Sequence, residues 1–310
     1  MLPRNLFLIV LLSSLLLVAC SGTPTSSADD LNVVASTTII GDVVRMVGGE
    51  QIELTVLFPV DADPHSFSPV PKVIAEIETA DVVFINGFGL EEALEELIVN
   101  TAVEEVVSVS EGIIPLEFDA GSGESEEEHE HEHHGDDPHV WMSPLNVKIW
   151  ADNIAEALGE LDPVNSEVYR SNLENYQSEL DGLHSWILEQ VAQIPQDDRL
   201  LITDHDTMSY FAVLYDFETI GVILPGGGTL AEPSAQDIAQ LEDTITSYQV
   251  PAIFVGTTVN TQLAERISRD TGVQLVPLYA GSLSSQDGPA STYIKLMRHN
   301  VSAIVSALKA

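Results

Sequence analysis

Short apolar runs rich in β-branched residues alternate with helical segments along most of the chain, and this alternation limits the fold more than any other feature. It is typical of α/β proteins, in which helices cover both faces of a parallel sheet. Candidate strands lie at 31–37, 52–58, 81–86 and 105–109 in the first half, and at 199–204, 251–256 and 273–278 in the second.

Between the two halves, one apolar stripe predicts an unusually long helix. Apolar side chains recur every three or four residues across 169–194, which places them on one helix face. Asp162 can cap this helix, Pro163 suits its first turn, and Pro195 ends it. About 30 residues at 1.5 Å each give a rod of about 45 Å. We therefore expect one rigid helix to join the two halves.

These patterns predict an α/β protein with two domains, each with a mainly parallel sheet flanked by helices, and a single rigid helix between them. About 280 residues after a leader suffice for two such domains. The predicted bounds are 31–160 for the N-terminal domain, 161–195 for the linking helix and 196–310 for the C-terminal domain. A second helix, from a Ser143 cap to Gly159, would close the first domain.

The N-terminus predicts secretion and a lipid anchor. Residues 1–19 place Arg4 before an apolar run of about 13 residues, shorter than the roughly 20 that a bilayer requires, so we interpret them as a signal peptide. The run ends in LVAC, which resembles the bacterial lipobox, in which the cysteine receives a diacylglycerol after cleavage. Cys20 would then begin a lipidated tether over 20–30, and the mature protein would be extracytoplasmic and bound to the membrane through its lipid.

Cysteine content and charge limit the metal sites and the partners that the protein can have. Cys20 is the only cysteine, so the protein has no intramolecular disulfide and no thiolate metal site. The chain contains 11 Lys and Arg residues and 49 Asp and Glu residues, so its net charge is −38. Such a surface repels phosphate backbones and attracts cations, so we expect no nucleic-acid partner. Adaptation to salt, or a need for solubility, would explain the charge equally well.

One segment departs from the apolar pattern. Residues 121–138 hold eight carboxylates and four histidines with almost no apolar side chain, and we expect a mobile loop there. The four histidines would form an accessory metal loop that collects metal for the main site; they are His129, His131, His133 and His134. Two alternatives remain open: the loop senses metal abundance, or it is a solvated insertion without a metal role.

Three other histidines stand in settings that suit metal ligation. His65 and His139 each follow an Asp-Pro pair, and proline limits the directions in which the next side chain can point. His205 follows a strand candidate, and ligands of parallel sheets bind beyond the carboxyl ends of strands. A metal bound by all three would lie between the two domains. His184 and His299 lack such settings, and we interpret both as structural.

Six segments resemble the metal-binding solute receptors of ABC importers with a helical backbone, a family that includes zinc and manganese lipoproteins. They are FPVDADPHSFSP, DDPHVWMSP, ITDHDTMSYFA, AEPSAQDIAQL, PAIFVGTTVN and LYAGSLSSQDGPASTY. The resemblance spans nearly the whole mature chain and implies two α/β domains joined by a rigid helix around one metal. It implies ligands from the first three segments, here His65, His139 and His205, and an ABC importer permease and its ATPase as partners.

The metal and the activity follow from the same resemblance. Many manganese members have glutamate where this chain has His205, and imidazoles suit zinc better than manganese, so we expect Zn²⁺ as cargo. The predicted function is a monomeric substrate-binding lipoprotein, not an enzyme. A manganese (Mn²⁺) receptor of the same family is the first alternative. A zinc hydrolase and a surface protein for cell adhesion are weaker ones. No HExxH motif or nucleophile elbow supports the hydrolase, whereas the lipoprotein architecture is compatible with adhesion.

Two glycines depart from the family pattern. Gly281 stands where these receptors usually carry an aspartate that is the fourth ligand, and Gly256 stands where they commonly carry glutamate. We therefore expect a three-histidine site whose fourth ligand is water, a loop histidine or a nearby carboxylate. Asp206 and Asp287 are the weaker candidates for that carboxylate.

Overall fold

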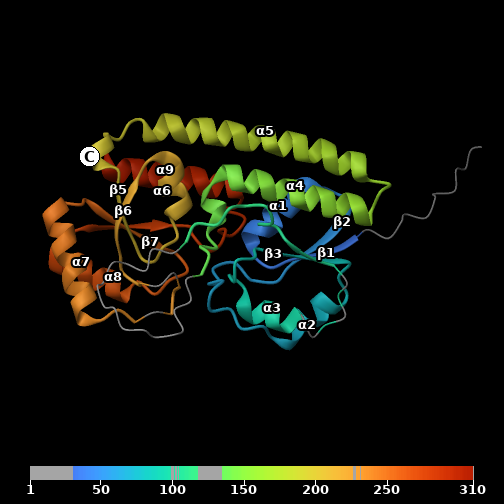
Figure 1. Cartoon of the computed structure of the whole chain (residues 1–310), viewed down its shortest axis with the longest axis horizontal. Coiled ribbons are helices and arrows are strands. Elements are labelled where there is room, and N and C mark those ends of the chain that lie inside the picture. The colour runs from blue at the N-terminus through green and yellow to red at the C-terminus, as the bar shows by residue number, and fades with distance from the viewer. Residues whose placement is uncertain are drawn as a thin grey trace, which may run out of the picture. The chain divides into compact units, whose positions relative to one another are not determined.

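Two parallel four-stranded sheets form the framework of the computed structural model, which describes residues 31–98, 101, 103, 105–117, 135–225, 228–230 and 232–309 (Figure 1). The N-terminal sheet has the order β2-β1-β3-β4 and comprises β1 (Leu31–Ala35), β2 (Ile52–Val56), β3 (Val82–Ile85) and β4 (Val106–Ser108). The C-terminal sheet has the order β6-β5-β7-β8 and comprises β5 (Leu200–Thr203), β6 (Glu218–Val222), β7 (Ala252–Gly256) and β8 (Gln274–Leu278). Both sheets therefore have the same winding order.

Alternate residues of the N-terminal sheet face two different cores, as the twofold period of a strand requires. Val33 and Phe84 belong to a core that includes α1 (Thr38–Gly48), α4 (Pro144–Leu161) and α5 (Ser166–Val191). Val34 and Val83 face the opposite side, which is covered by α2 (Pro71–Glu78) and α3 (Glu92–Ile98). Burial on both faces explains why these runs are almost wholly apolar.

The C-terminal sheet repeats this arrangement. Leu201 and Phe254 belong to the same core as α6 (Ser209–Tyr215) and α9 (Tyr293–Leu308). Ile202 and Ile253 face a separate core formed with α7 (Ala235–Tyr248) and α8 (Gln262–Thr271). Each sheet thus has helices on both faces, and the predicted fold class is confirmed.

Helices on one side of both sheets join the two halves. One apolar core runs from the N-terminal sheet through α1, α4, α5, α6 and α9 to the C-terminal sheet. The long helix α5 contacts α1 and α4 from the first half and α9 from the second (Figure 1). Its stripe is buried, including Tyr169, Tyr176 and Ile187. The joining helix is therefore anchored along its length, and the described residues belong to one compact unit, Leu31–Ala310.

The predicted start of this helix was wrong. Asp162 does not cap α5; it ends α4, and its carboxylate accepts hydrogen bonds from the Asn165 side chain at 2.6 Å and the Tyr169 hydroxyl at 2.9 Å. The residue before a proline disfavours helical geometry, so Pro163 stops α4 at this point. Asn165 occupies the N-cap position of α5 without a capping side-chain hydrogen bond, and the helix has 26 residues and a length of about 39 Å. The upstream helix begins at the predicted Ser143 cap and ends two residues beyond Gly159.

Strand β6 was missed by the sequence analysis. Its sequence ETIGV contains a charged residue and a glycine, and none of its residues is fully buried, because it lies at the edge of its sheet. Gly221 is closely packed, since an added Cβ would lie 2.7 Å from Leu241 Cδ1 and that methyl group would have to shift. Edge position and a small residue together remove the apolar pattern that identified the other strands.

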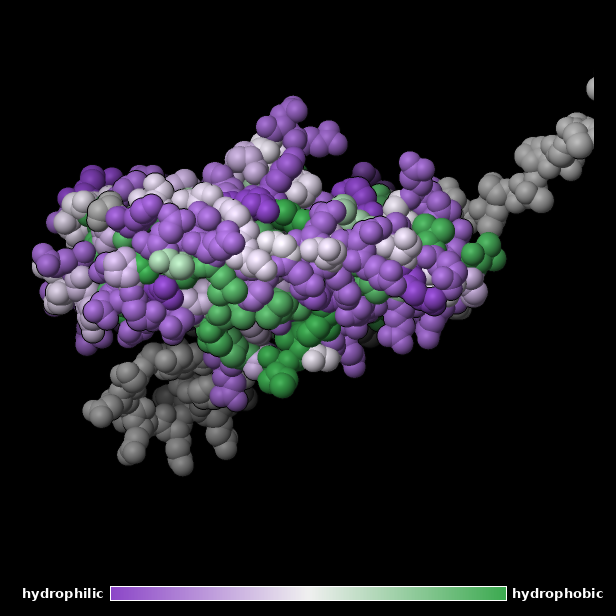
Figure 2. Space-filling view, turned by 90° about the horizontal axis from the view of Figure 1, so that it is seen from above, coloured by the Kyte–Doolittle hydropathy of each residue, from purple (hydrophilic) through white to green (hydrophobic). Residues whose placement is uncertain are grey.

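No helix among the described residues is long and apolar enough to cross a bilayer. Figure 2 shows hydrophilic residues over most of the face seen from above, with a hydrophobic area near its middle. The predicted signal peptide, the Cys20 anchor, the tether and the four histidines at 129–134 lie outside the described residues. The two-domain bounds remain a prediction.

Candidate metal centre

His65, His139 and His205 converge at one point. Their ring centroids form a nearly equilateral triangle with sides of 5.0, 5.4 and 5.2 Å. One nitrogen of each ring lies within 4.8 Å of the other two, and this is the single group of potential metal ligands found among the residues that the structure describes. The structure thus brings together all three residues that the sequence singled out, although they lie up to 140 positions apart.

The spacing of the nitrogens suits a small tetrahedral ion. The Nε2 atoms of His65 and His139 are 3.0 Å apart. A tetrahedral zinc with Zn–N bonds of about 2.0–2.1 Å holds two ligand nitrogens about 3.3 Å apart. Small side-chain movements would therefore place three imidazole nitrogens around one ion.

Two of the rings are oriented by carboxylates. His139 Nδ1 is 2.8 Å from Asp137 Oδ1, and His205 Nδ1 is 3.1 Å from Asp204 Oδ1. A carboxylate at Nδ1 keeps the proton on that nitrogen and leaves the Nε2 lone pair for a metal. Neither aspartate was predicted to be functional, although each lies one or two positions before its histidine.

The third ring is held differently. Asp63 Oδ1 accepts a hydrogen bond from the backbone N–H of His65 at 3.1 Å, as Asp137 and Asp204 do for their histidines. Among the described residues, no carboxylate is hydrogen-bonded to the His65 ring. Asp63 Oδ2 instead accepts from the Ser66 hydroxyl at 2.9 Å and the Thr229 hydroxyl at 2.6 Å. The His65 loop is therefore tied to the second half of the chain rather than to its own ring.

Burial also separates the three histidines. His139 is 1% exposed and His205 is 3% exposed, whereas His65 is only partly buried. Desolvation, followed by repulsion from His139 and His205, lowers the pKa of His65 to about 2. Desolvation also lowers the pKa of His139, although Asp137 opposes it. These two rings are therefore neutral at physiological pH, which is the state that binds metal.

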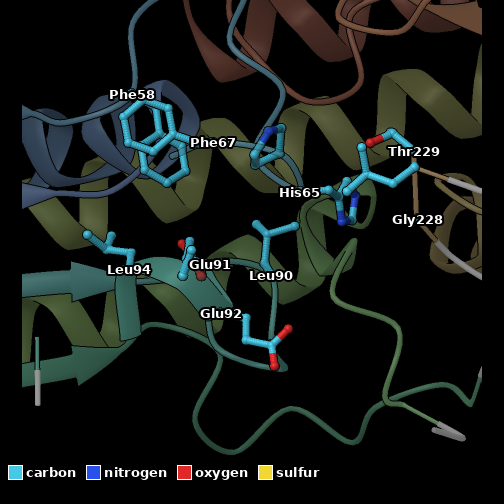
Figure 3. Close-up of a pocket in the computed structure, with 13 residues that line it drawn as sticks. Phe58, His65, Phe67, Leu90, Glu91, Glu92, Leu94, Gly228 and Thr229 are labelled. Atoms are coloured by element: carbon cyan, nitrogen blue, oxygen red, sulfur yellow. The ribbon is translucent and has the colours of Figure 1, made fainter. Parts of the chain in front are cut away.

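A cavity of about 260 Å³ adjoins His65. Figure 3 shows Phe58 and Phe67 on one side of it, His65 and Thr229 on the other, and Leu90 and Glu91 between them. Glu91 is 2% exposed, and its Oε1 accepts from the Ser36 hydroxyl at 2.5 Å. Burial raises the pKa of Glu91 to about 7. The centre is thus approached from the His65 side, past residues of both halves of the chain.

Neither glycine that departs from the family pattern leaves open space. A Cβ on Gly281 would lie 3.0 Å from Pro64 Cδ and 3.1 Å from Thr258 Oγ1. A Cβ on Gly256 would lie 3.0 Å from Asp204 Oδ2, which accepts a hydrogen bond from the Gly256 N–H at 2.8 Å. The backbone of Gly256 therefore supports the aspartate that orients His205.

The remaining histidines of the described chain have other contacts. His184 Nδ1 is 3.0 Å from the Tyr215 hydroxyl, and the His299 ring lies edge-on to Tyr279 with centroids 5.3 Å apart. Both agree with the structural interpretation. Asp206 and Asp287 do not belong to the group of potential ligands that the structure describes.

The chain is similar to a known protein family and to several metal-binding proteins. The family described as zinc-uptake complex component A, periplasmic, matches residues 33–307. The manganese-binding lipoprotein MntA of Halalkalibacterium halodurans is 33% identical over 306 residues, 97% of each chain. The iron-binding protein YfeA of Yersinia pestis is 31% identical over 304 residues, 96% of this chain and 94% of its own. The structure of the periplasmic zinc binding protein TroA from Treponema pallidum has a TM-score of 0.78 at 26% identity, over 90% of this chain and 99% of its own.

The chain belongs to the zinc-uptake complex component A family, and it is a metal-binding substrate-binding protein of the ABC importer class. A further relative, the substrate-binding lipoprotein PsaA of Streptococcus pneumoniae, is named as part of a manganese ABC transporter and is 29% identical over 311 residues. These relatives are receptors for metal transport, so the prediction that the chain is not an enzyme is confirmed. The name of PsaA, as part of an ABC transporter, implies a permease and an ATPase as its partners, in agreement with the prediction from the sequence.

Proposed function

We propose that this protein captures a divalent transition metal at His65, His139 and His205 and delivers it to the permease and ATPase of an importer, with zinc as the preferred cargo. The observation that carries the proposal is the approach of three imidazole nitrogens to within 4.8 Å of one another. Two of the rings have a carboxylate oxygen at Nδ1, which favours the tautomer that directs the Nε2 lone pair to the metal. An unliganded protein gains nothing from crowding three neutral imidazoles, whereas a metal receptor requires it.

Ligand chemistry supports zinc over manganese. The described site offers nitrogen alone, and imidazole suits zinc, whereas manganese favours more carboxylate and water oxygen. Gly281, at the position where the resembling receptors usually carry the aspartate ligand, adds no oxygen. A specific observation favours the alternative: MntA, which is named as manganese-binding, is 33% identical to this chain. A manganese receptor of the same family is therefore the second candidate function.

Alanine variants test the site. His65→Ala, His139→Ala and His205→Ala should each weaken zinc binding by more than about 100-fold, because loss of an outer partner alone costs 10–100-fold. His184→Ala and His299→Ala are the matched controls and should bind like the parent. Chelator competition measures the affinity, and parent-like binding by all three site variants would refute the site. Direct competition between zinc and manganese on the parent then decides the cargo.

We also propose that Cys20 carries the lipid anchor and that the four histidines at 129–134 bind additional, weaker metal. The composition of that segment supports the second proposal. A deletion of residues 121–134 keeps Asp136, which bridges to Glu117, and Asp137, whose N–H donates to Leu116 O at 2.7 Å. The deletion should lower the zinc stoichiometry at saturation and leave the tight site unchanged. Unchanged stoichiometry would refute the accessory role, and mass spectrometry of membrane-extracted protein tests the lipid.

A further inference from the structure

One tyrosine hydroxyl joins the loops that carry two of the histidines. Tyr210 lies in the first turn of α6, five residues after His205, and its side chain is 6% exposed. Its hydroxyl donates to the Asp137 carbonyl at 2.8 Å and accepts from the Leu116 N–H at 3.0 Å. Asp137 is the residue whose carboxylate orients the His139 ring. A side chain from the His205 segment therefore holds the backbone of the residue that aims His139.

Further contacts fix the segments to which the Tyr210 hydroxyl is bonded. Asp137 N donates to Leu116 O at 2.7 Å, so the tyrosine hydroxyl binds two segments that are already bonded to each other. Helix α6 also packs against the short 3₁₀ helix η1 (Val140–Met142), which follows His139 directly. Burial raises the pKa of Tyr210 to about 12, so its hydroxyl keeps the proton that it donates. Packing and hydrogen bonding thus act on the same short segment from the same helix.

We propose that Tyr210 is a positioning residue that sets the separation of His139 and His205 and thereby favours a small tetrahedral ion over manganese. The proposal rests on the three-histidine site proposed above. His139 and His205 come from different halves of the chain, so local structure alone does not fix the distance between their Nε2 atoms. The Tyr210 hydroxyl connects those halves directly, because Tyr210 lies five residues after His205 and bonds to Asp137, two residues before His139.

The expected effect of Tyr210→Phe on metal binding follows from the loss of the hydroxyl. Without the hydroxyl, the Asp137 carbonyl and the Leu116 N–H lose a buried partner, and the segment would move to recover one from water. The Asp137 carboxylate and the His139 ring would move with it. Tetrahedral zinc depends on the placement of all three nitrogens, whereas manganese relies more on oxygen ligands such as water. Zinc should therefore lose more affinity than manganese.

The chain offers a matched control in the same helix. Tyr215 ends α6, is 2% exposed, and its hydroxyl is bonded to His184 Nδ1 at 3.0 Å, away from the metal ligands. Tyr210→Phe and Tyr215→Phe each remove one buried hydroxyl and keep the ring that packs in the core. The metal-free melting temperature should fall for both variants, and more for Tyr210→Phe, which loses two hydrogen bonds rather than one. A purely structural role for Tyr210 would make the two variants alike in metal binding.

The experiment measures zinc and manganese affinities by chelator competition for the full mature protein and for both variants. Tyr210→Phe should weaken zinc about tenfold, the lower end of the range for outer partners, and manganese less than about threefold. Tyr215→Phe should leave both affinities within about threefold of the parent. Equal affinities for Tyr210→Phe and Tyr215→Phe, or equal losses for zinc and manganese, would overturn the proposal.

A double-mutant cycle separates this proposal from the site itself. If Tyr210 acts through His139, Tyr210→Phe should have no further effect on the residual zinc binding of His139→Ala. An undiminished tenfold effect in that background would overturn the positioning role. Parent-like binding by His139→Ala would instead refute the three-histidine site, so the two failures have different signatures.

Discussion

His139 and His205 differ from His65 in how the protein holds them. The first two rings are almost wholly buried and share their Nδ1 protons with Asp137 and Asp204, whereas the His65 ring is partly exposed. Asp63 holds only the backbone of His65, and its second oxygen bonds to Thr229. The difference divides the centre into a fixed pair of ligands and one adjustable ligand on the side of the cavity.

This division suits a receptor better than a permanent metal site. A transport protein must bind its cargo and also release it, whereas a structural zinc site is closed by four fixed ligands. Two oriented rings give affinity and geometry before the metal arrives. We infer that the third ring, which no described carboxylate orients, is the ligand that adjusts when the ion binds or leaves. Three predictions follow from the comparison.

The largest effect is expected from the carboxylates of the fixed pair. Asp137→Asn and Asp204→Asn should each weaken zinc binding 10–100-fold, because an amide orients the ring without raising its basicity. Asp63→Asn should cost less than about tenfold, since this residue has no bond to the His65 ring. Chelator competition on the three variants measures the difference. If Asp63→Asn were as damaging as Asp137→Asn, the division into fixed and adjustable ligands would be wrong.

Substitutions of Gly281 should change the zinc affinity less, and they test the part of the site that His65 forms. An added Cβ would crowd Pro64, the residue before His65, so Gly281→Ala should weaken zinc. Gly281→Asp introduces the same crowding together with a carboxylate that can close the tetrahedron and offset part of the +2 charge. We expect Gly281→Asp to bind zinc about tenfold more tightly than Gly281→Ala, and to narrow the preference over manganese. Equal affinities of the two variants would show that the carboxylate does not reach the metal.

The sequence predicted the fold class and the three histidines because their signals are local. Seven of the eight strands are apolar runs, and each site histidine follows an Asp or an Asp-Pro pair. The roles of Asp137 and Asp204 were missed although their spacing was visible, since an aspartate before a histidine is more often a turn residue. An Asp that recurs just before all three candidate histidines is the signal that could have identified them.

Other features depend on packing and were beyond sequence analysis. The role proposed for Tyr210 depends on contacts of α6 with residues 116 and 137, which are more than 70 positions away. Asp162 looked like a helix cap, but in the folded chain its carboxylate closes the turn between α4 and α5. The common core that runs through five helices from one sheet to the other is likewise a property of the assembled chain.

The last effect concerns the stability of the metal-free protein and its dependence on pH. An unfolded histidine takes up a proton near pH 6.5. Burial lowers the pKa of His65 to about 2 and also lowers that of His139, so the folded protein leaves both rings neutral where the unfolded chain is protonated. The unfolded state then binds more protons, and the free energy of unfolding falls as the pH drops below about 6.5. Urea denaturation of metal-free protein between pH 7.5 and 4.5 measures this loss.

Glu91 opposes that trend and makes the prediction specific. Burial raises its pKa from 4.5 to about 7, so its contribution to stability is present below pH 4.5 and is lost as the pH rises through 7. Between about pH 4.5 and 6.5 the protonation of Glu91 therefore offsets part of the loss caused by the two histidines. Glu91→Gln, which copies the neutral carboxyl, should steepen the acid destabilisation by up to about 1.4 kcal/mol per pH unit, and His65→Ala should make it shallower. Slopes that were the same in the parent and in both variants would mean that neither group differs in protonation between the folded and unfolded states. The adjustable ligand would then titrate like a solvated imidazole, and its distinction from the fixed pair would rest on the hydrogen bonds of Asp137 and Asp204 alone.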